Sequence, residues 1–166
     1  ANYLISESPL PKAAVISSPW FTLTHKPPLF KYLMAGLVRY LLPGLTVKSD
    51  IDPQGLSHDQ EVVSLYNNDP LVHHAILPRL FFEIERHGMK ASQSIYKINI
   101  PLLVMHGNAD PITSFRQTAS FVRNAGNHTT VKQWPGAYHE LHNEPNEQEI
   151  FNYFLSWLNN LNFVPA

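Results

Sequence analysis

The sequence predicts an α/β fold, in which buried parallel strands alternate with helices. Residues 100–107 form an apolar run that ends in a glycine, which is typical of a strand buried on both faces of a parallel sheet. Residues 129–134 form a second strand, and a helical pattern follows each strand, at 115–124 and at 146–161. The order strand, helix, strand, helix is that of α/β architecture.

Capping and breaking residues mark the ends of these elements. Thr113 or Ser114 can cap the first helix, and Gly126 ends it. The Pro-Gly pair at 135–136 ends the second strand. The helix over 146–161 is amphipathic. Its apolar side carries Ile150, Phe151, Phe154, Leu155, Trp157 and Leu158.

Earlier in the chain, the pattern predicts one short strand with helices around it. Residues 1–6 have the character of the last turns of a helix, which stops before the following prolines. The apolar run 13–17 between prolines predicts a buried strand. Apolar residues recur at helical spacing over 30–42, and Pro43-Gly44 ends that helix.

A second long helix is expected to open at Asp69 and Pro70, with Asp69 as its N-cap and Pro70 at its first helical position. We expect this helix to extend to about Ile95. It should bend near Pro78 and be weakened at Gly88, because proline and glycine both disfavour a helix interior.

These elements divide the chain into three parts. Residues 1–19 hold the end of a helix and a core strand, and residues 96–166 hold the later core strands and helices. Between them, residues 20–95 form a mostly helical insertion between two strands of one sheet. An insertion of this length at strand ends is typical of a cap or lid over a site.

Composition excludes several classes of protein. The 166 residues are 44% hydrophobic and 15% charged, which suits a packed core and not a disordered chain. The formal net charge of -1 gives no general reason to bind nucleic acid. Cysteine is absent, so disulfides and thiolate metal sites are excluded. The longest apolar candidate, 32–45, is too short to span a membrane, and no signal peptide is visible, so we expect a cytoplasmic location.

Two residues stand where an acid and a base would be useful. Asp110 follows the strand at 100–107, and His139 follows the strand at 129–134. In an open parallel sheet both positions lie at the edge where ligands bind. An aspartate there can orient an imidazole, fix its tautomer and stabilise it when it takes a proton. Gly107 and Gly136 let the backbone turn sharply as it leaves each strand.

Less specific interpretations exist for both residues. An aspartate after a strand is often a helix cap or a turn residue, and the chain has nine histidines that compete for the role of base. Position favours His139 over the others. The histidine pair at 73–74 has no acidic partner at metal-ligand spacing, so no zinc site is expected. The competitors by composition are His106, His142, His73 and His74.

Four segments resemble α/β-hydrolases. Residues 100–112, IPLLVMHGNADPI, resemble the P-x-L-x-x-H-G-x-x-D segment of that fold. Residues 136–144, GAYHELHNE, are similar to the G-x-x-H-E-x-x-x-E segment of its monoacylglycerol lipase and lysophospholipase branch, the serine aminopeptidase S33-like hydrolases. Residues 66–71, YNNDPL, resemble the Y-x-x-D-P-L segment that enters the later cap helices of that branch. Residues 14–19, AVISSP, resemble the strand after the nucleophile helix.

The resemblance implies the C-terminal part of an α/β-hydrolase with a Ser-His-Asp triad, in which Asp110 is the acid and His139 the base. The nucleophile would lie on a G-x-S-x-G elbow before the helix that ends at residues 1–6, and no such elbow is present. The nearest string, GLSHD at 55–59, lacks the second glycine and lies in the insertion. We interpret it as a loop, with Ser57 or Asp59 capping a helix around 60–66.

Two expectations follow from the missing serine. The chain alone should not hydrolyse esters, because the nucleophile and both oxyanion donors are missing. The strand at 13–17 should be central, beside a strand that carries the serine, so its free edge would be apolar and adhesive. The expected partner is therefore the N-terminal part of the same hydrolase, and a metal or an organic cofactor is not required.

The insertion gives the only indication of substrate. Its apolar helix face includes Phe30, Leu33, Met34 and Leu37, which could line an acyl tunnel for a monoacylglycerol or a lysophospholipid, or contact a membrane surface peripherally. The simpler interpretation is that these side chains pack the cap onto the main domain, since apolar helix faces are normally core.

Other functions remain open for the same acid and base. A serine nucleophile would make the protein an esterase, lipase or peptidase, whereas an aspartate would make it a dehalogenase or an epoxide hydrolase. If only this piece of the protein existed, it would be a non-catalytic interaction module. The resemblances of residues 136–144 and 66–71 favour the esterase.

Overall fold

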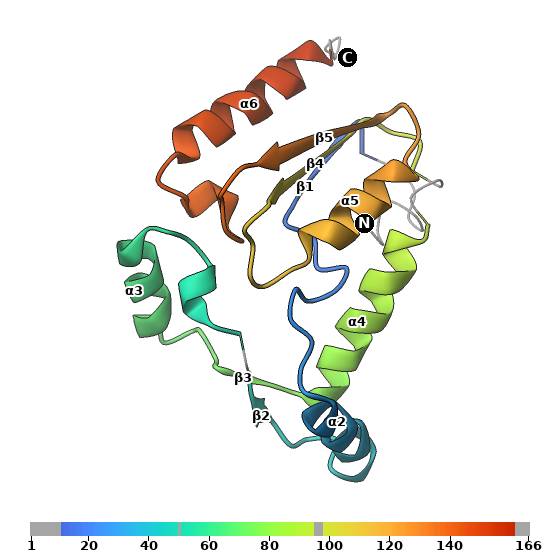
Figure 1. Cartoon of the computed structure of the whole chain (residues 1–166), viewed down its shortest axis with the longest axis vertical. Coiled ribbons are helices and arrows are strands. Elements are labelled where there is room, and N and C mark those ends of the chain that lie inside the picture. Colours follow the sequence, from blue (N-terminus) through green and yellow to red (C-terminus); the bar gives the residue numbers. More distant parts are fainter. Residues whose placement is uncertain (1–10, 50, 95–97, 162–166) are drawn as a thin grey trace.

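A computed structural model describes residues 11–49, 51–94 and 98–161 (Figure 1). A three-stranded parallel sheet lies at its centre, with the strand order β1-β4-β5. Strand β1 spans Ala14–Ser17, β4 spans Leu102–Gly107 and β5 spans Thr129–Trp134. Ala14 pairs with Leu102, and Gly107 pairs with Trp134, so β4 is hydrogen-bonded on both sides. The predicted α/β fold is confirmed.

Strand β4 separates two apolar clusters by the alternation of its side chains. Leu102 and Val104 face one cluster, which includes Phe121 of α5, Phe115–Arg123. Leu103 and Met105 face the other cluster, which includes Ile150 of α6, Glu147–Asn160. Successive side chains of a strand point to opposite faces of the sheet, so this fully buried strand carries apolar residues from Leu102 to Met105. Helices α5 and α6 therefore cover opposite faces (Figure 1).

The expected strand and helix boundaries in the last third are confirmed. Ser114 is the N-cap of α5, and its hydroxyl accepts a hydrogen bond from the backbone N–H of Gln117. Strand β1 is also present, but its first three residues are only half-buried and Ser17 is exposed; among the described residues it pairs with β4 alone. A neighbour for β1 outside this chain stays a prediction. The expected helix end at residues 1–6 lies outside the described residues.

The described residues of the insertion form three α-helices, one 3-10 helix and a small antiparallel ladder. Helix α2 spans Leu29–Leu41, as predicted, and the 3-10 helix η1 spans Pro53–Gly55. Helix α3 spans Gln60–Asn68, with Asp59 as its N-cap. Strands β2, Val47–Lys48, and β3, Ala75–Ile76, pair with each other. In Figure 1 these elements extend away from the central sheet, and α4, Pro78–Ser92, runs back towards it.

The expected helix from Asp69 to about Ile95 is wrong in its first part. Asp69 follows α3, and its Oδ1 accepts a hydrogen bond of 2.8 Å from the backbone N–H of Leu71. The chain then passes through β3 before α4 begins at Pro78. Proline disfavours the helical conformation in the residue before it and fits the first helical position, so Pro78 starts this helix and does not bend it.

Gly88 lies where the backbone of another segment packs against α4, and the helix continues through it. A Cβ atom at this position would collide with the backbone carbonyl oxygens of Trp20 and Phe21. The glycine lets the segment that follows β1 lie directly against the helix. None of the helices in the described part of the chain is long and apolar enough to cross a membrane.

Candidate active site

Asp110 and His139 meet at the carboxyl edge of the sheet. Strands β4 and β5 are parallel and in register, so the loops that follow them leave the sheet side by side. The Oδ2 atom of Asp110 lies 2.8 Å from Nδ1 of His139. The two residues are 29 positions apart in the sequence, and the pairing of β4 with β5 brings them together.

The carboxyl group of Asp110 is held by its own loop. Its Oδ1 accepts hydrogen bonds from the backbone N–H groups of Ile112, at 2.7 Å, and Thr113, at 2.9 Å. Asp110 is 4% exposed. These bonds point Oδ2 towards His139, because they leave the carboxyl group little freedom to rotate.

The Oδ2 atom of Asp110 has three hydrogen-bond partners. Besides His139, the Thr113 hydroxyl donates to it at 2.8 Å, and Nε2 of His106 lies 3.0 Å away. On the other side of the His106 ring, Nδ1 lies 2.8 Å from the Thr118 hydroxyl. Because the Thr118 hydroxyl can donate to Nδ1, a neutral His106 ring can carry its hydrogen on Nε2 and donate it to Asp110.

These contacts keep Asp110 ionised. Burial raises the pKa of the Asp110 carboxyl group, but hydrogen bonds from His106 and His139 lower it, as do the charge on His139 and the Thr113 N–H. The lowering effects are together stronger, so the pKa of Asp110 lies well below its ordinary value. A permanently charged partner is what an imidazole needs if it is to take up a proton.

His139 is held by its backbone while one ring nitrogen remains available. The Ser18 hydroxyl donates to the His139 carbonyl oxygen at 2.5 Å, and the His139 N–H donates to the Gly55 carbonyl oxygen at 3.3 Å. The side chain is 25% exposed. Within the described residues, Nε2 has no hydrogen-bond partner. The imidazole is therefore oriented through Nδ1 and able to accept a proton at Nε2.

Two glycines shape the loops in different ways. Gly136 has a φ of 76°, a left-handed conformation that favours glycine, as the sharp turn after β5 requires. The turn after β4 begins at Gly107, whose carbonyl oxygen accepts a hydrogen bond from the Asp110 N–H at 3.3 Å. A Cβ atom there would also collide with the backbone carbonyl oxygens of Ala137 and Tyr138, so this glycine lets the loop that carries His139, residues 137–144, lie against the end of β4.

Comparison with known families decides where the chain belongs. The model of the serine aminopeptidase, S33 family matches residues 1–146. The chain belongs to the serine aminopeptidase S33 family. It is 33% identical over 129 residues to the monoacylglycerol lipase of Mycolicibacterium smegmatis, a match that covers 75% of this chain and 45% of that protein.

Two further relatives agree with this assignment. The chain is 31% identical over 116 residues to the monoglyceride lipase of Mus musculus, which covers 69% of this chain and 38% of that protein. The crystal structure of Paleococcus ferrophilus monoacylglycerol lipase has a TM-score of 0.86 at 28% identity, over 95% of this chain and 62% of that one. The resemblance to the monoacylglycerol lipase branch of α/β-hydrolases is thus confirmed. The chain spans only part of the length of each of these relatives.

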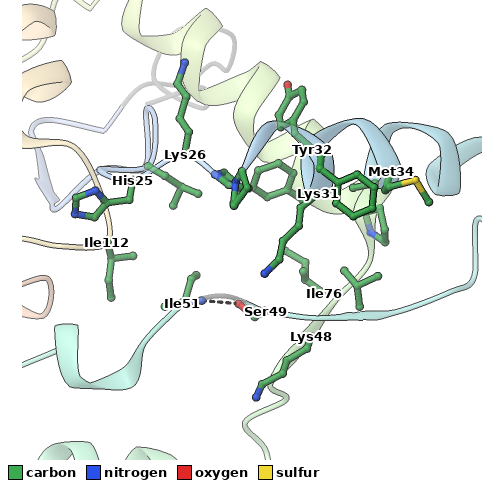
Figure 2. Close-up of a pocket in the computed structure, with 18 of the residues that line it drawn as sticks. His25, Lys26, Lys31, Tyr32, Met34, Lys48, Ser49, Ile51, Ile76 and Ile112 are labelled. Carbon is green, nitrogen blue, oxygen red and sulfur yellow. Dashed lines mark hydrogen bonds between the residues drawn. The ribbon is translucent and has the colours of Figure 1, made fainter.

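An apolar cavity of about 920 Å³ lies in the insertion of this S33 family chain. Figure 2 shows Lys31 of α2 above Ser49 and Ile51, with His25 and Ile112 at one end. Ile112 is two positions after Asp110, so one end of the cavity lies beside the loop of the acid. Asp110 and His139 are not among the lining residues.

The four cap residues predicted to contact substrate divide into two pairs. Phe30 and Met34 line the cavity, whereas Leu33 and Leu37 do not. Leu33 is 62% exposed and Leu37 is 53% exposed, and α2 has no buried residue. The simpler interpretation, that this face is packed as core, therefore does not hold among the described residues.

The four histidines considered as alternatives to His139 lie in different surroundings. His73, His74 and His142 are exposed, and His106 is buried against the acid. Among the described residues, no group of three or more metal-ligating side chains gathers in a form that could hold a metal ion.

Sequence reasoning missed His106 and Thr113 as partners of the acid. His106 was considered only as a competitor for the base, and Thr113 only as a helix cap. The spacing His106-x-x-x-Asp110 is the one available signal, because a histidine at the end of a fully buried strand needs a polar partner.

Proposed function

We propose that this chain is the C-terminal part of a serine hydrolase that cleaves carboxylic esters, with Asp110 as the acid and His139 as the base of a Ser-His-Asp triad. The nucleophilic serine lies outside this chain. The observation that carries the proposal is the 2.8 Å hydrogen bond between a buried, ionised aspartate and a histidine whose other ring nitrogen is available.

The reaction follows from the state of the two ring nitrogens. Nε2 of His139 takes the proton of the serine hydroxyl as the serine oxygen attacks the ester carbonyl. The imidazolium then donates this proton to the leaving alcohol. A water molecule, deprotonated by the same nitrogen, attacks the acyl-enzyme and releases the acid. Asp110 stabilises the charge on the ring each time it forms, and no metal or organic cofactor takes part.

A monoacylglycerol or a lysophospholipid-like ester is the substrate that we propose. The cavity in the insertion is large and mainly apolar in its lining, and one end lies at Ile112 beside the acid loop. An acyl chain fits such a lining, because apolar side chains bind it by excluding water. Two of the relatives compared here bear the name monoacylglycerol lipase.

The chain by itself is proposed to be inactive. It needs the N-terminal part of the same hydrolase, which would supply the serine and the oxyanion donors. The parallel edge of β1, paired on one side only among the described residues, is where this part would add its strand.

The exposed face of α2 is proposed to touch a membrane surface peripherally. Phe30 and Leu41 are 73% and 67% exposed, and they belong to an apolar patch that also includes Leu29, Leu33, Leu37 and Tyr40. A patch of this kind marks an interaction site. Binding of the complete protein to lipid vesicles should decrease when Leu33 and Leu37 are both replaced by serine. Equal binding of the wild type and the double variant would contradict the membrane contact.

Other reactions of the fold depend on the missing nucleophile. An aspartate in its place would favour an epoxide hydrolase or a dehalogenase, and a serine leaves both an esterase and a peptidase open. The decisive experiment uses the complete protein, which is incubated with a fluorophosphonate that labels reactive serines. We expect stoichiometric labelling and parallel loss of monoacylglycerol hydrolysis. A complete, folded protein that is neither labelled nor active on esters would contradict the proposal.

A further inference from the structure

The side chain of Glu144 is buried beside the base loop and takes no part in the contact between Asp110 and His139. It is 3% exposed. Glutamate is rarely buried so completely unless it has partners, and Glu144 has several. Its Oε1 accepts a hydrogen bond from the backbone N–H of Tyr138, and Nδ1 of His58 lies 2.9 Å from its Oε2. The backbone N–H of His58 also donates to Oε2, at 3.4 Å.

These partners come from two distant segments. Tyr138 is the residue immediately before His139. His58 belongs to the insertion and lies 86 positions before Glu144 in the sequence. The imidazole of His58 also stacks on the ring of Tyr138, with 3.7 Å between the ring centroids and 25° between the planes. The carboxyl group of Glu144 therefore joins the residue before the base to the insertion.

The same two segments are joined by three more hydrogen bonds. The Glu140 N–H donates to the Leu56 carbonyl oxygen at 2.8 Å, on one side of the base. The hydroxyl of Ser57, a fully buried residue, donates to the Asn143 carbonyl oxygen at 2.6 Å. The bond from the His139 N–H to the Gly55 carbonyl oxygen completes the set. We call the contact between residues 55–58 and the loop 137–144 the clip.

The clip also reaches the loop of the acid. A Cβ atom at Gly55 would overlap the side chain of Pro111, which follows Asp110. Residues 55–58 therefore pack against the loops of both members of the acid-base pair. A displacement of this segment would therefore shift the loop of Asp110 and the loop of His139, and so disturb the hydrogen bond between the two side chains.

We propose that Glu144 is a positioning residue, which sets the orientation of His139 by tying the backbone of Tyr138 to residues 55–58 of the insertion. This inference rests on the proposed function, because it gives Glu144 a task only if His139 is the base. The imidazole must point Nε2 at the serine within a narrow range, and a misplacement of about 1 Å costs on the order of 100-fold in rate. The insertion thus helps to align the base, in addition to any contact with substrate.

Two replacements distinguish the effect of the hydrogen bonds of Glu144 from the effects of its side-chain size and charge. Glu144→Ala removes every acceptor and leaves the N–H groups of Tyr138 and His58 without their partner. Glu144→Gln keeps one oxygen for the Tyr138 N–H, and its amide can donate to Nδ1 of His58 in the other tautomer; only the 3.4 Å bond from the His58 backbone N–H is lost. His87→Ala is the matched control, because it removes a histidine that lies 3.5 Å from a glutamate on the exposed surface of α4.

The experiment is an active-site titration of the complete protein with a chromogenic organophosphate, followed by steady-state kinetics on a monoacylglycerol. Titration counts the competent serine sites, so kcat is expressed per functional site and is independent of any misfolded fraction. For Glu144→Ala we expect kcat per site to fall by about 10- to 100-fold, with KM within about twofold of the wild type. Glu144→Gln should recover most of this loss, and His87→Ala should match the wild type.

Three results would overturn the positioning role. The first is a Glu144→Ala protein with fewer titratable sites but an unchanged kcat per site, because the residue would then only stabilise the fold. The second is a Glu144→Gln protein as slow as Glu144→Ala, and the third is an equal loss in His87→Ala. A wild-type protein without any titratable serine would instead contradict the proposed function.

Discussion

The Nε2 atom of His106 lies 3.0 Å from the Oδ2 atom of Asp110, the same oxygen that contacts His139. Both His106 and Asp110 are buried, so the acid is shared between a structural imidazole inside the protein and a partly exposed one at the surface. The buried imidazole helps to hold the carboxylate in its charged form, and the partly exposed one is the base of the proposed mechanism.

The first prediction concerns this inner contact. His106→Leu removes a hydrogen bond to a charged group and leaves the Thr118 hydroxyl without its partner. We expect the free energy of unfolding of the complete protein to fall by about 1.5–3 kcal/mol. Denaturant unfolding measures this change. His128→Leu is the control, since this exposed side chain should shift the value by less than about 0.5 kcal/mol. An equal loss of unfolding free energy in both variants would contradict the role assigned to His106.

A second prediction distinguishes the base from its neighbour. His139→Ala should lower kcat for ester hydrolysis by about four orders of magnitude or more, because the serine loses its proton acceptor. The circular dichroism spectrum should not change. His142→Ala should leave the rate close to that of the wild type, because this side chain is exposed. The reverse pattern would mean that His142 is the base.

The third prediction tests the charge of the acid without removing its shape. Asp110→Asn keeps an oxygen that can accept from the N–H groups of Ile112 and Thr113, so the loop should stay folded. The amide cannot stabilise an imidazolium and favours the wrong tautomer of His139, so kcat should fall by about 10⁴-fold. Kinetics on a soluble ester give the rate. A variant with more than a tenth of the wild-type rate would show that the charge of Asp110 is not needed.

The fourth prediction follows from the lowered pKa of Asp110. A carboxyl group whose pKa is lower in the folded state stabilises the fold above its unfolded pKa of about 3.9, and this contribution is lost as the pH falls towards the folded pKa. The difference in free energy of unfolding between the wild type and Asp110→Asn should therefore shrink below about pH 4, as the Asp110 carboxyl group takes up a proton. Denaturant titrations at a series of pH values measure this difference. A constant difference down to the lowest pH at which the fold survives would contradict the sign of the shift.

The fifth prediction concerns the close approach of the base loop to β4. Gly107→Ala places a methyl group against the carbonyl oxygens of Ala137 and Tyr138, which must move away and take His139 with them. We expect a loss of about 1–3 kcal/mol in the free energy of unfolding, together with a lower kcat. Gly126→Ala is the control, because nothing lies near the added methyl group there. Thermal unfolding and ester hydrolysis of the two variants, measured side by side, test the difference.

Local patterns predicted most of the sheet and the helices that cover it. Strand β4 was predictable because a strand buried on both faces is apolar throughout, and α5 because Ser114 caps it. The segment between α3 and α4 could not be predicted from local sequence patterns. The Asp69-Pro70 pair has the form of a helix start, yet Asp69 caps a turn, and the helix begins at the next proline. A capping pattern indicates that a helix can start at a residue. It does not show that a helix follows there in the tertiary fold.

By itself, the sequence determined the order of the three strands of the central sheet and of α5 and α6, the positions of Asp110 and His139 after two strands, and the family resemblance. These properties depend on residue types that are close together in the chain. Only the tertiary structure decided that His106 supports the acid, and that Glu144 joins the base loop to the insertion through His58. Those contacts satisfy buried carboxyl groups, in the second case with a residue 86 positions away, because a buried carboxyl group needs a hydrogen-bond partner. No local pattern specifies which partner that is.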